Sequence, residues 1–249
     1  MSHIRDVSPT QDQPIIVVSC RPWNNSLPGR LNQRLDRYVK HVTNLSELTY
    51  EAIAKENPEW IFVAHWNHII PESIWRKWPT VIFHMTDLPY GRGGSPLQNL
   101  ILLKQRTTVL SAIRCEAGMD TGDIYLKENL SLDGSAEEIF LRANHIMEHM
   151  IEEIIREKPI PTRQSGTPVL FKRRSPDQSN IAHCPEGDIR AWYDHIRMLD
   201  AAGYPHAFLE ANGMRIELRR VSWRSEGLYA DVKIMPLSQE QTKDRDTES

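Results

Sequence analysis

The sequence predicts an α/β protein: a mostly parallel sheet with helices on its faces, followed by a small C-terminal α+β subdomain. Between residues 14 and 160, short continuous apolar runs, typical of strands buried on both faces, alternate with segments of helical periodicity. Such alternation favours crossover connections and a parallel sheet. After residue 160, one helical segment and an Asn-Gly hairpin signal follow. We therefore expect a main domain over residues 1–160, a subdomain over 161–237 and a charged, disordered tail over 238–249.

The elements of the main domain are predicted from local signals. Apolar runs predict the strands Pro14–Cys20, Trp60–Ala64, Val81–Phe83, Thr107–Cys115 and Asp123–Leu130. Helical spacing and Pro or Gly boundaries predict the helices Leu31–Val39, Ser46–Glu56, Pro71–Lys77 and Leu97–Gln105. The last of these has Ser95 as its N-cap and Pro96 at its first position. A capping box, Ser135-x-x-Glu138, opens a long helix that ends before Pro159.

The subdomain is predicted from fewer signals. A linker with the short strand Val169–Lys172 precedes a helix over Asp188–Leu199. Two strands then flank the turn Asn212-Gly213, and one more strand completes the subdomain: Ala207–Ala211, Met214–Leu218 and Leu228–Met235.

Composition limits the classes of partner that we expect. Hydrophobic residues make up 40% of the 249 residues, enough to bury a sizeable core. The formal net charge is −3, which argues against a large nucleic-acid footprint. The three cysteines have no metal-ligand spacing and indicate a reduced, cytoplasmic chain without a metal. No signal peptide and no apolar run of membrane-spanning length is visible, so no membrane association is expected.

A twelve-residue loop after the third strand is the strongest functional signal. It runs His-Met-Thr-Asp-Leu-Pro-Tyr-Gly-Arg-Gly-Gly-Ser from His84 to Ser95. Open α/β sheets bind ligands at strand ends, and glycines let backbone amides approach a substrate closely. An ordinary turn with a solvated histidine is the alternative for this loop alone. A second segment, Glu116–Ile124, contains Met-Asp-Thr-Gly-Asp and favours the functional interpretation.

Together the two segments resemble the 10-formyltetrahydrofolate-dependent formyltransferases, over about residues 14–160. His84, Leu88-Pro89, Arg92-Gly93, Ser95 to Gln98 and Met119 to Asp123 stand where that family has Asn-x-His, Leu-Pro, Arg-Gly and a Leu-Asp-x-Gly-like turn. The loop is most similar to bacterial sugar N-formyltransferases, above all to the type that acts in pseudaminic acid biosynthesis. The segment from Trp192 to Pro205 resembles the family's C-terminal subdomain. We expect this subdomain to serve packing and not chemistry, and we leave open whether it also forms a homodimer.

The resemblance implies a Rossmann-like, mostly parallel formyltransferase domain and a transferase that uses 10-formyltetrahydrofolate as formyl donor. The implied acceptor is the amino group of a nucleotide-linked amino sugar, such as a UDP-linked 4-amino-4,6-dideoxy sugar, made for lipopolysaccharide and other surface glycans. No nucleic-acid partner is expected.

The resemblance also implies two catalytic roles. His84 would take the proton of the amine, since histidine titrates near neutral pH, and Asp120 would orient it. The alternatives are a structural strand-end histidine and a turn aspartate. Asp123 is the rival of Asp120, although a structural role is favoured for it.

One position departs from the family. Two residues before the histidine, where the family carries an asparagine that donates to the oxyanion, this chain has Ile82. Asn67, after a neighbouring strand, is our first choice for the catalytic donor, because its amide has the right chemistry. Thr86, His68 and backbone amides of the glycine loop are the alternatives.

The binding residues implied by the resemblance fall into two groups. The pterin would pack among Trp66, Ile69, Ile70, Pro71, Glu116, Ala117, Gly118, Met119 and Asp120. The acceptor would contact Trp23, Asn24, Asn25, Tyr90, Arg92 and Gly93. Arg92 would pair with a phosphate of the acceptor's nucleotide. For Trp66, Ile69 and Ile70, simple core packing is an equal alternative.

Three other functions are weighed against the sugar enzyme. One is a methionyl-tRNA formyltransferase, for which a larger, basic C-terminal domain would be expected, and another is a purine-precursor formyltransferase. The third is a non-catalytic folate- or nucleotide-binding module, which Ile82 supports and which His84 and Asp120 disfavour.

Overall fold

The computed structural model describes residues 13–237, so the predicted disordered tail, 238–249, lies outside the described residues. The chain forms two compact units, each built from several segments. Unit 1 consists of the chain up to Gly93 together with Thr108–Leu130 and Phe140–Leu170. Unit 2 consists of Gly94–Thr107, Ser131–Ile139 and the chain from Phe171 onward.

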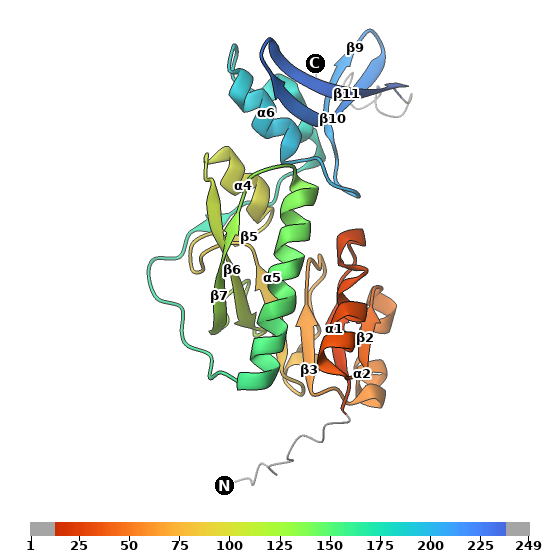
Figure 1. Cartoon of the computed structure of the whole chain (residues 1–249), viewed down its shortest axis with the longest axis vertical. Coiled ribbons are helices and arrows are strands. Elements are labelled where there is room, and N and C mark those ends of the chain that lie inside the picture. The colour runs from red at the N-terminus through yellow and green to blue at the C-terminus, as the bar shows by residue number, and fades with distance from the viewer. Residues whose placement is uncertain (1–12, 238–249) are drawn as a thin grey trace, which may run out of the picture. The chain divides into compact units, whose positions relative to one another are not determined.

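Unit 1 is built on a six-stranded sheet with the strand order β2-β1-β3-β4-β6-β7 (Figure 1). Its strands are β1 (Ile15–Val18), β2 (Val39–Val42), β3 (Trp60–Val63), β4 (Thr80–His84), β6 (Thr107–Arg114) and β7 (Ile124–Ser131). The first four in sheet order are parallel, and β6 runs antiparallel to β4. The predicted Rossmann-like, mostly parallel sheet is therefore confirmed.

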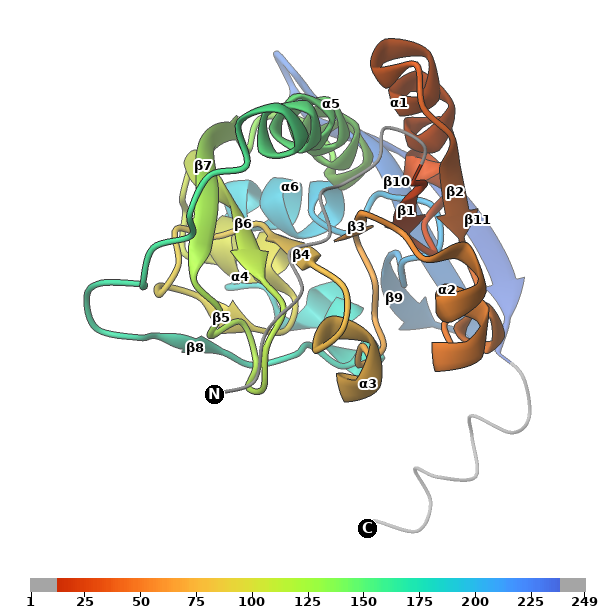
Figure 2. The ribbon, with the colours of Figure 1, turned by 90° about the horizontal axis from the view of Figure 1, so that it is seen from below.

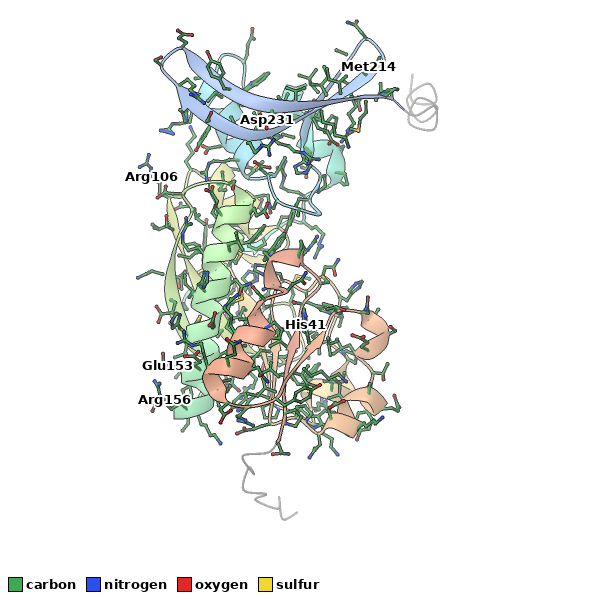
Figure 3. All side chains as sticks on the ribbon, turned by 45° about the vertical axis from the view of Figure 1, so that its right-hand side comes forward. His41, Arg106, Glu153, Arg156, Met214 and Asp231 are labelled. Atoms are coloured by element: carbon green, nitrogen blue, oxygen red, sulfur yellow. The ribbon has the colours of Figure 1, made fainter. Side chains whose placement is uncertain are left out.

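Helices cover both faces of this sheet. Figure 2 shows α1 (Leu27–Leu35) and α5 (Ala136–Glu157) on one side, and α2 (Tyr50–Glu56) and α3 (Glu72–Trp75) on the other. Strand residues alternate between the faces, so Ile16 and Ile61 meet the helix residues Ile53 and Ile74 in one core cluster. All four are at most 1% exposed, and burying each such side chain contributes roughly 1.5–3 kcal/mol. Arg156, labelled in Figure 3, lies on the exposed side of α5.

Two predicted segments of unit 1 differ from the structure. The helix expected over Leu31–Val39 is confirmed up to Leu35 and wrong beyond it, because α1 ends there and Asp36 takes a left-handed conformation (φ +48°). Val39 then begins β2, whose two valines are buried while Lys40 and His41 are half-buried, as in an edge strand. The helix expected over Ser46–Glu56 is divided into η2 (Leu45–Glu47) and α2, since Thr49 caps the latter by accepting from the Ala52 amide at 3.2 Å.

The remaining elements of unit 1 are short. They are the 3-10 helix η1 (Pro22–Asn24), β5 (Arg92–Gly93) and the first residue of β8 (Leu170–Phe171). The capping box of α5 is confirmed, since the Ser135 amide donates to Glu138 Oε2 at 2.7 Å and the Glu138 amide donates to Ser135 Oγ at 3.3 Å.

Unit 2 combines helices with an antiparallel sheet of order β11-β10-β9. Its elements are α4 (Pro96–Leu102), η3 (Pro176–Ser179), η4 (Ile181–His183), α6 (Ile189–Arg197), β9 (Ala207–Ala211), β10 (Met214–Arg224) and β11 (Gly227–Pro236). The predicted hairpin is confirmed, with both Asn212 and Gly213 at positive φ. Ser95 precedes α4 as predicted but does not cap it: its hydroxyl accepts from the Arg174 amide at 3.0 Å instead.

The described part of the chain, residues 13–237, contains no helix with the length and apolarity needed to cross a bilayer.

Candidate functional site

The imidazole of His84 and the carboxylate of Asp120 face each other in unit 1. His84 is the last residue of β4, and Asp120 lies in the loop between β6 and β7. His84 Nδ1 is 3.5 Å from Asp120 Oδ2, and both side chains are largely buried, at 8% and 14% exposed. The Gly93 amide donates to the same oxygen at 2.8 Å. The structure therefore brings together three predicted site residues from the two loops.

The other ring nitrogen of His84 also has a partner. His84 Nε2 lies 2.8 Å from the carbonyl oxygen of Gly91, to which the Thr86 hydroxyl donates at 3.3 Å. Because a carbonyl oxygen only accepts, Nε2 carries a proton in this contact. A doubly protonated ring satisfies both Gly91 and Asp120, whereas a neutral ring satisfies only one of them. An Nε2 atom that accepts a proton from a substrate would first have to lose its own proton and its contact with the Gly91 carbonyl.

Gln164 holds the backbone of the Asp120 loop in place. Its Nε2 donates to the carbonyl oxygens of Asp120 and Gly122, both at 2.8 Å. Its Oε1 accepts from Arg92 Nε at 3.1 Å and from Arg92 Nη2 at 2.7 Å. Asp120 has φ +53°, a left-handed conformation that needs such support in a residue other than glycine. Sequence reasoning missed Gln164, since its partners lie 44 and 72 residues away and its own segment was predicted to be a linker.

The segment expected to hold the pterin after β3 has two kinds of side chain. Ile70 is 5% exposed and belongs to the core cluster, and Pro71 precedes α3. Ile69, by contrast, is 90% exposed. Trp66 packs against the core, yet among the described residues its buried Nε1 has no hydrogen-bond acceptor. Packing thus explains Ile70, and it leaves Ile69 and the Trp66 donor unexplained.

The second pterin segment lies in the loop of Asp120. Met119 is 69% exposed, although it is apolar. Gly118 has φ +104°, and a Cβ there would lie 2.8 Å from Thr121 Oγ1, so the loop requires glycine. The Ala117 carbonyl accepts from Thr121 Oγ1 at 3.1 Å, and the Glu116 carboxylate lies 3.6 Å from Arg114.

Trp23 and Asn24, expected to contact the acceptor, are buried inside unit 1. Trp23 stacks on Phe140, with ring centroids 4.5 Å apart, and its Nε1 donates to His65 Nδ1 at 3.1 Å. Asn24 Oδ1 lies 3.0 Å from the same nitrogen, while Asn25 is exposed. The pKa of His65 is lowered from 6.5 to about 3, mainly by burial and to a smaller extent by the positive charge of Arg21. Trp23, Asn24, His65 and Phe140 thus form an uncharged, packed cluster that follows the ends of β1 and β3.

Asn67 lies beside the end of β1. Its Oδ1 accepts from Cys20 Sγ at 3.4 Å, and the residue is exposed. Ile82 is part of the strand that ends at His84, and two residues along a strand place side chains on the same face. It packs against the core cluster and offers no donor. The amide donor expected from Asn67 stays a prediction.

Asp123 and Tyr90, in the same two loops, have partners in unit 1. The Asp123 carboxylate pairs with Arg114 at 2.7 Å, which is a structural role. Tyr90 is half-buried, and its amide donates to the Asp87 carbonyl at 3.0 Å. Over residues 13–237, no three His, Cys, Asp or Glu side chains form a cluster that could hold a metal ion.

Comparison with known proteins places this chain in a family. The methionyl-tRNA formyltransferase C-terminal domain matches residues 176–235. A solved methionyl-tRNA formyltransferase from Clostridium thermocellum is 42% identical, with a TM-score of 0.87, and the match covers 90% of this chain and 100% of that one.

The chain belongs to the formyltransferase family. Among its curated relatives, the methionyl-tRNA formyltransferase of Rickettsia prowazekii is 26% identical over 186 residues, which is 70% of this chain. The chain spans 59% of the length of that relative. A Mycobacterium tuberculosis protein described as a likely sugar N-formyltransferase is 16% identical, with a TM-score of 0.66, covering 83% of this chain and 96% of that one, and shares the fold.

The expected acceptor is therefore wrong. The relatives with substantial identity are named for methionyl-tRNA, so a nucleotide-linked amino sugar and a place in pseudaminic acid or lipopolysaccharide biosynthesis are contradicted. The exclusion of a nucleic-acid partner is wrong as well. The motif from His84 onward indicates formyl transfer and does not distinguish acceptors. A net charge of −3 describes the whole chain and does not exclude a local basic surface.

Proposed function

We propose that this chain transfers the formyl group of 10-formyltetrahydrofolate to the α-amino group of methionyl-tRNA. The observation that carries this proposal is the 42% identity to the Clostridium thermocellum methionyl-tRNA formyltransferase across the whole of that protein. The His84–Asp120 pair supports it, because transfer to an amine requires a group that removes a proton. The acceptor would be a cytoplasmic molecule, so the expected cytoplasmic location is part of this proposal.

The residues around the two loops fit a flat, partly polar donor such as a reduced pterin. Ile69 and Met119 are exposed apolar side chains, one on each of the two segments implied to bind it. The Trp66 indole nitrogen is a buried donor that has no partner among the described residues. A ring seated between the segments would cover the two apolar side chains and offer acceptors to buried donors. Bound there, 10-formyltetrahydrofolate would supply the formyl carbon.

In this proposal His84 removes the proton of the amine as its nitrogen attacks. His84 Nε2 first leaves the Gly91 carbonyl and gives its own proton to solvent, and the neutral ring, with its remaining proton on Nδ1, is then the proton acceptor. Asp120 pairs with Nδ1–H on the opposite side of the ring and stabilises the imidazolium that results. The bond between the formyl carbon and the folate nitrogen then breaks, and the imidazolium returns the proton to that nitrogen, so that tetrahydrofolate leaves. The Gly93 amide donates to the Asp120 carboxylate, and the Gln164 side chain donates to the Asp120 carbonyl oxygen, so both keep the carboxylate in position while the charge develops.

The donor that stabilises charge on the formyl oxygen is assigned to Asn67, with Thr86 as the alternative. Thr86 is fully buried, next to His84 in the chain, and its hydroxyl donates to the Gly91 carbonyl at 3.3 Å. The movement of Gly91 that frees His84 would free this hydroxyl as well. Ile82 can supply no hydrogen bond.

The proposal is tested by incubating the purified full chain with 10-formyltetrahydrofolate and methionyl-tRNA. Formyl-methionine released from the tRNA is measured by mass spectrometry. Uncharged tRNA and free methionine are the matched controls, and neither should be formylated at a comparable rate. If methionyl-tRNA gives no product while the chain binds the folate, the chain is a binding module and the proposed function is refuted.

A further inference from the structure

The three-stranded sheet of unit 2 has one edge that meets another segment and one edge that is open. At the β9 edge, Asn180 forms a bridge with Phe208. At the other edge, β11 has β10 on one side, and within residues 13–237 no strand pairs with its outer side. The unpaired amide and carbonyl groups along such an edge are a template for another strand.

The strand at this open edge is long and regular, and it exposes apolar side chains. β11 has ten residues, and the bulge of the hairpin lies in β10, where Arg220 has φ +48° and the register shifts. Val232 and Ile234 are 52% and 64% exposed. They lie on one face, opposite Leu218 and Ile216 of β10. Edge strands that avoid pairing are usually short or bulged, and β11 is neither.

The backbone groups that face the open side belong to alternate residues of β11. The Leu237 amide donates to the Gly213 carbonyl at 2.9 Å, one pair beyond the end of the hairpin register. Hydrogen-bonded and non-hydrogen-bonded pairs alternate along an antiparallel ladder. Counting back from Leu237, the odd-numbered residues of β11 therefore bond to β10. The even-numbered residues direct their amide and carbonyl groups to the open side: Ala230, Val232 and Ile234.

The charges of β11 are arranged so that the strand complements a second copy of itself. Asp231 and Lys233 flank Val232 and lie on the other face of the strand. When two copies pair antiparallel with Val232 at the centre, Asp231 of each copy lies opposite Lys233 of the other. The same register places Val232 opposite Val232, and Ala230 opposite Ile234. The two nearest registers that pair the same backbone groups are centred on Asp231 and on Lys233, and each places two like charges opposite each other, which is unfavourable.

Both charged groups are accessible for this contact. Lys233 is exposed and forms no ion pair within the described residues. Asp231 accepts from Arg220 of the neighbouring strand, and its side chain is 56% exposed. A carboxylate has acceptor sites on two oxygens, so it can receive a lysine as well. A lysine by itself on an edge strand opposes pairing, but here the same strand supplies the opposite charge.

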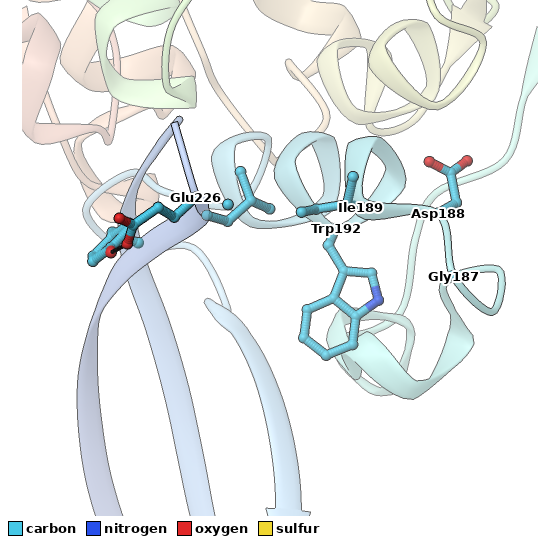
Figure 4. Close-up of a pocket in the computed structure, with 8 residues that line it drawn as sticks. Gly187, Asp188, Ile189, Trp192 and Glu226 are labelled. Atoms are coloured by element: carbon cyan, nitrogen blue, oxygen red, sulfur yellow. Dashed lines mark hydrogen bonds between the residues drawn. The ribbon is translucent and has the colours of Figure 1, made fainter. Parts of the chain in front are cut away.

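More exposed apolar surface lies at the start of the same strand. The pocket shown in Figure 4 has a volume of about 640 Å³, and its lining includes Leu228 and Tyr229 of β11 and Trp192 of α6. Tyr229 is 50% exposed and Trp192 is 38% exposed. In the register centred on Val232, Pro236 of the second copy lies opposite Leu228. A second copy would therefore cover apolar surface at both ends of the paired strands as well as at their centre.

We propose that two copies of this chain pair through β11, about a two-fold axis at Val232, and join their three-stranded sheets into one continuous sheet. Backbone hydrogen bonds link the even-numbered residues of the two strands, and the two Asp231–Lys233 pairs determine the register. This inference does not rest on the proposed formyl transfer, because it uses residues of unit 2 alone.

The test uses charge reversal on the purified full chain. Lys233→Glu places a carboxylate opposite Asp231 of the second copy, and Asp231→Lys places an ammonium group opposite Lys233 of the second copy. A mixture of the two variants restores both pairs of opposite charge, in a heterodimer. Lys55→Glu is the matched control, since it reverses one exposed charge on α2. Sedimentation velocity measures assembly, and thermal melting shows whether each variant is folded.

We expect the wild type and Lys55→Glu to dimerise as their concentration rises. Each of the two edge variants alone should weaken the dimer by at least about tenfold, because two attractive pairs become repulsive. Their mixture should form a heterodimer about as stable as the wild-type dimer. A second measurement needs no variant: the outward amides of Ala230, Val232 and Ile234 should exchange hydrogen more slowly as the wild type is concentrated.

A wild type that stays monomeric at its highest soluble concentration would overturn the inference. If its outward amides are then protected at every dilution, another part of the same chain covers the edge. A dimer that survives both charge reversals, or a mixture of folded variants that forms no heterodimer, would also overturn the inference, because the interface would then lie elsewhere.

Discussion

Gln164 should control turnover through the loop that carries Asp120, although it does not touch His84. The side chain makes four hydrogen bonds, two as donor to the carbonyl oxygens of Asp120 and Gly122 and two as acceptor from Arg92. Gln164→Ala removes all four. Gln164→Glu keeps an acceptor for Arg92 and replaces the donor by an oxygen that faces two carbonyl oxygens. Both variants should lose the two hydrogen bonds that hold the Asp120 loop. Gln164→Glu should lose them while Arg92 keeps its acceptor.

The size of the effect is estimated from the two donated bonds. Each is 2.8 Å long and between neutral groups, so each contributes about 1 kcal/mol. If the whole of about 2 kcal/mol is lost in the transition state, kcat falls about 30-fold, since about 1.4 kcal/mol corresponds to a factor of ten. KM for methionyl-tRNA should change little, because the side chain orients Asp120 and is not assigned a contact with the acceptor.

Steady-state formylation of methionyl-tRNA measures both constants, and thermal melting reports the fold. Gln33→Ala is the matched control, an exposed glutamine on α1. Two residues that act in one unit are not additive, so Gln164→Ala combined with Asp120→Asn should be no slower than Asp120→Asn alone. Wild-type kcat in a folded Gln164→Glu variant, or additive losses in the double variant, would refute the reasoning.

Three further predictions concern single residues of unit 1. His84→Ala and Asp120→Asn should each lower kcat by about 10²–10⁴ without unfolding the chain, and near-normal turnover in either would remove it from the reaction. Asn67→Ala should lower kcat by about 10²–10³ with little change in substrate binding, whereas an unchanged kcat would move the donor to Thr86. His65 should make the protein acid-labile: its folded pKa of about 3 lies below the value of 6.5 for the unfolded chain, so the unfolded state takes up the proton first as pH falls. The free energy of unfolding should therefore fall by roughly 1 kcal/mol per pH unit between those two values, measured by urea titration at several pH values. His65→Gln should flatten this dependence and the exposed His149→Gln should not; equal slopes in the wild type and His65→Gln would contradict the assignment.

Much of the fold was predictable because its signals are local. Buried parallel strands such as Ile15–Val18 and Trp60–Val63 are continuous apolar runs, and the capping box at Ser135 marks a helix start within four residues. The error at β2 has a physical reason as well. Val-Lys-His-Val, from Val39 to Val42, is a short edge strand whose middle residues face solvent in part, so it lacks the apolar run of a central strand.

The sequence by itself determined the formyltransferase family and predicted the residues that carry the chemistry. His84 and Asp120 were recognised from motifs within their own loops, because a strand end and a glycine turn leave a local pattern. The acceptor was not determined in this way, because the shared motif belongs to formyl transfer as such.

The partners of those residues depend on tertiary structure. The facing of His84 and Asp120 and the hydrogen bond from Gln164 to the Asp120 carbonyl oxygen join atoms from separate segments. Such contacts leave no periodicity and no spacing in the sequence, since they arise only when packing of the core brings distant loops within hydrogen-bond distance.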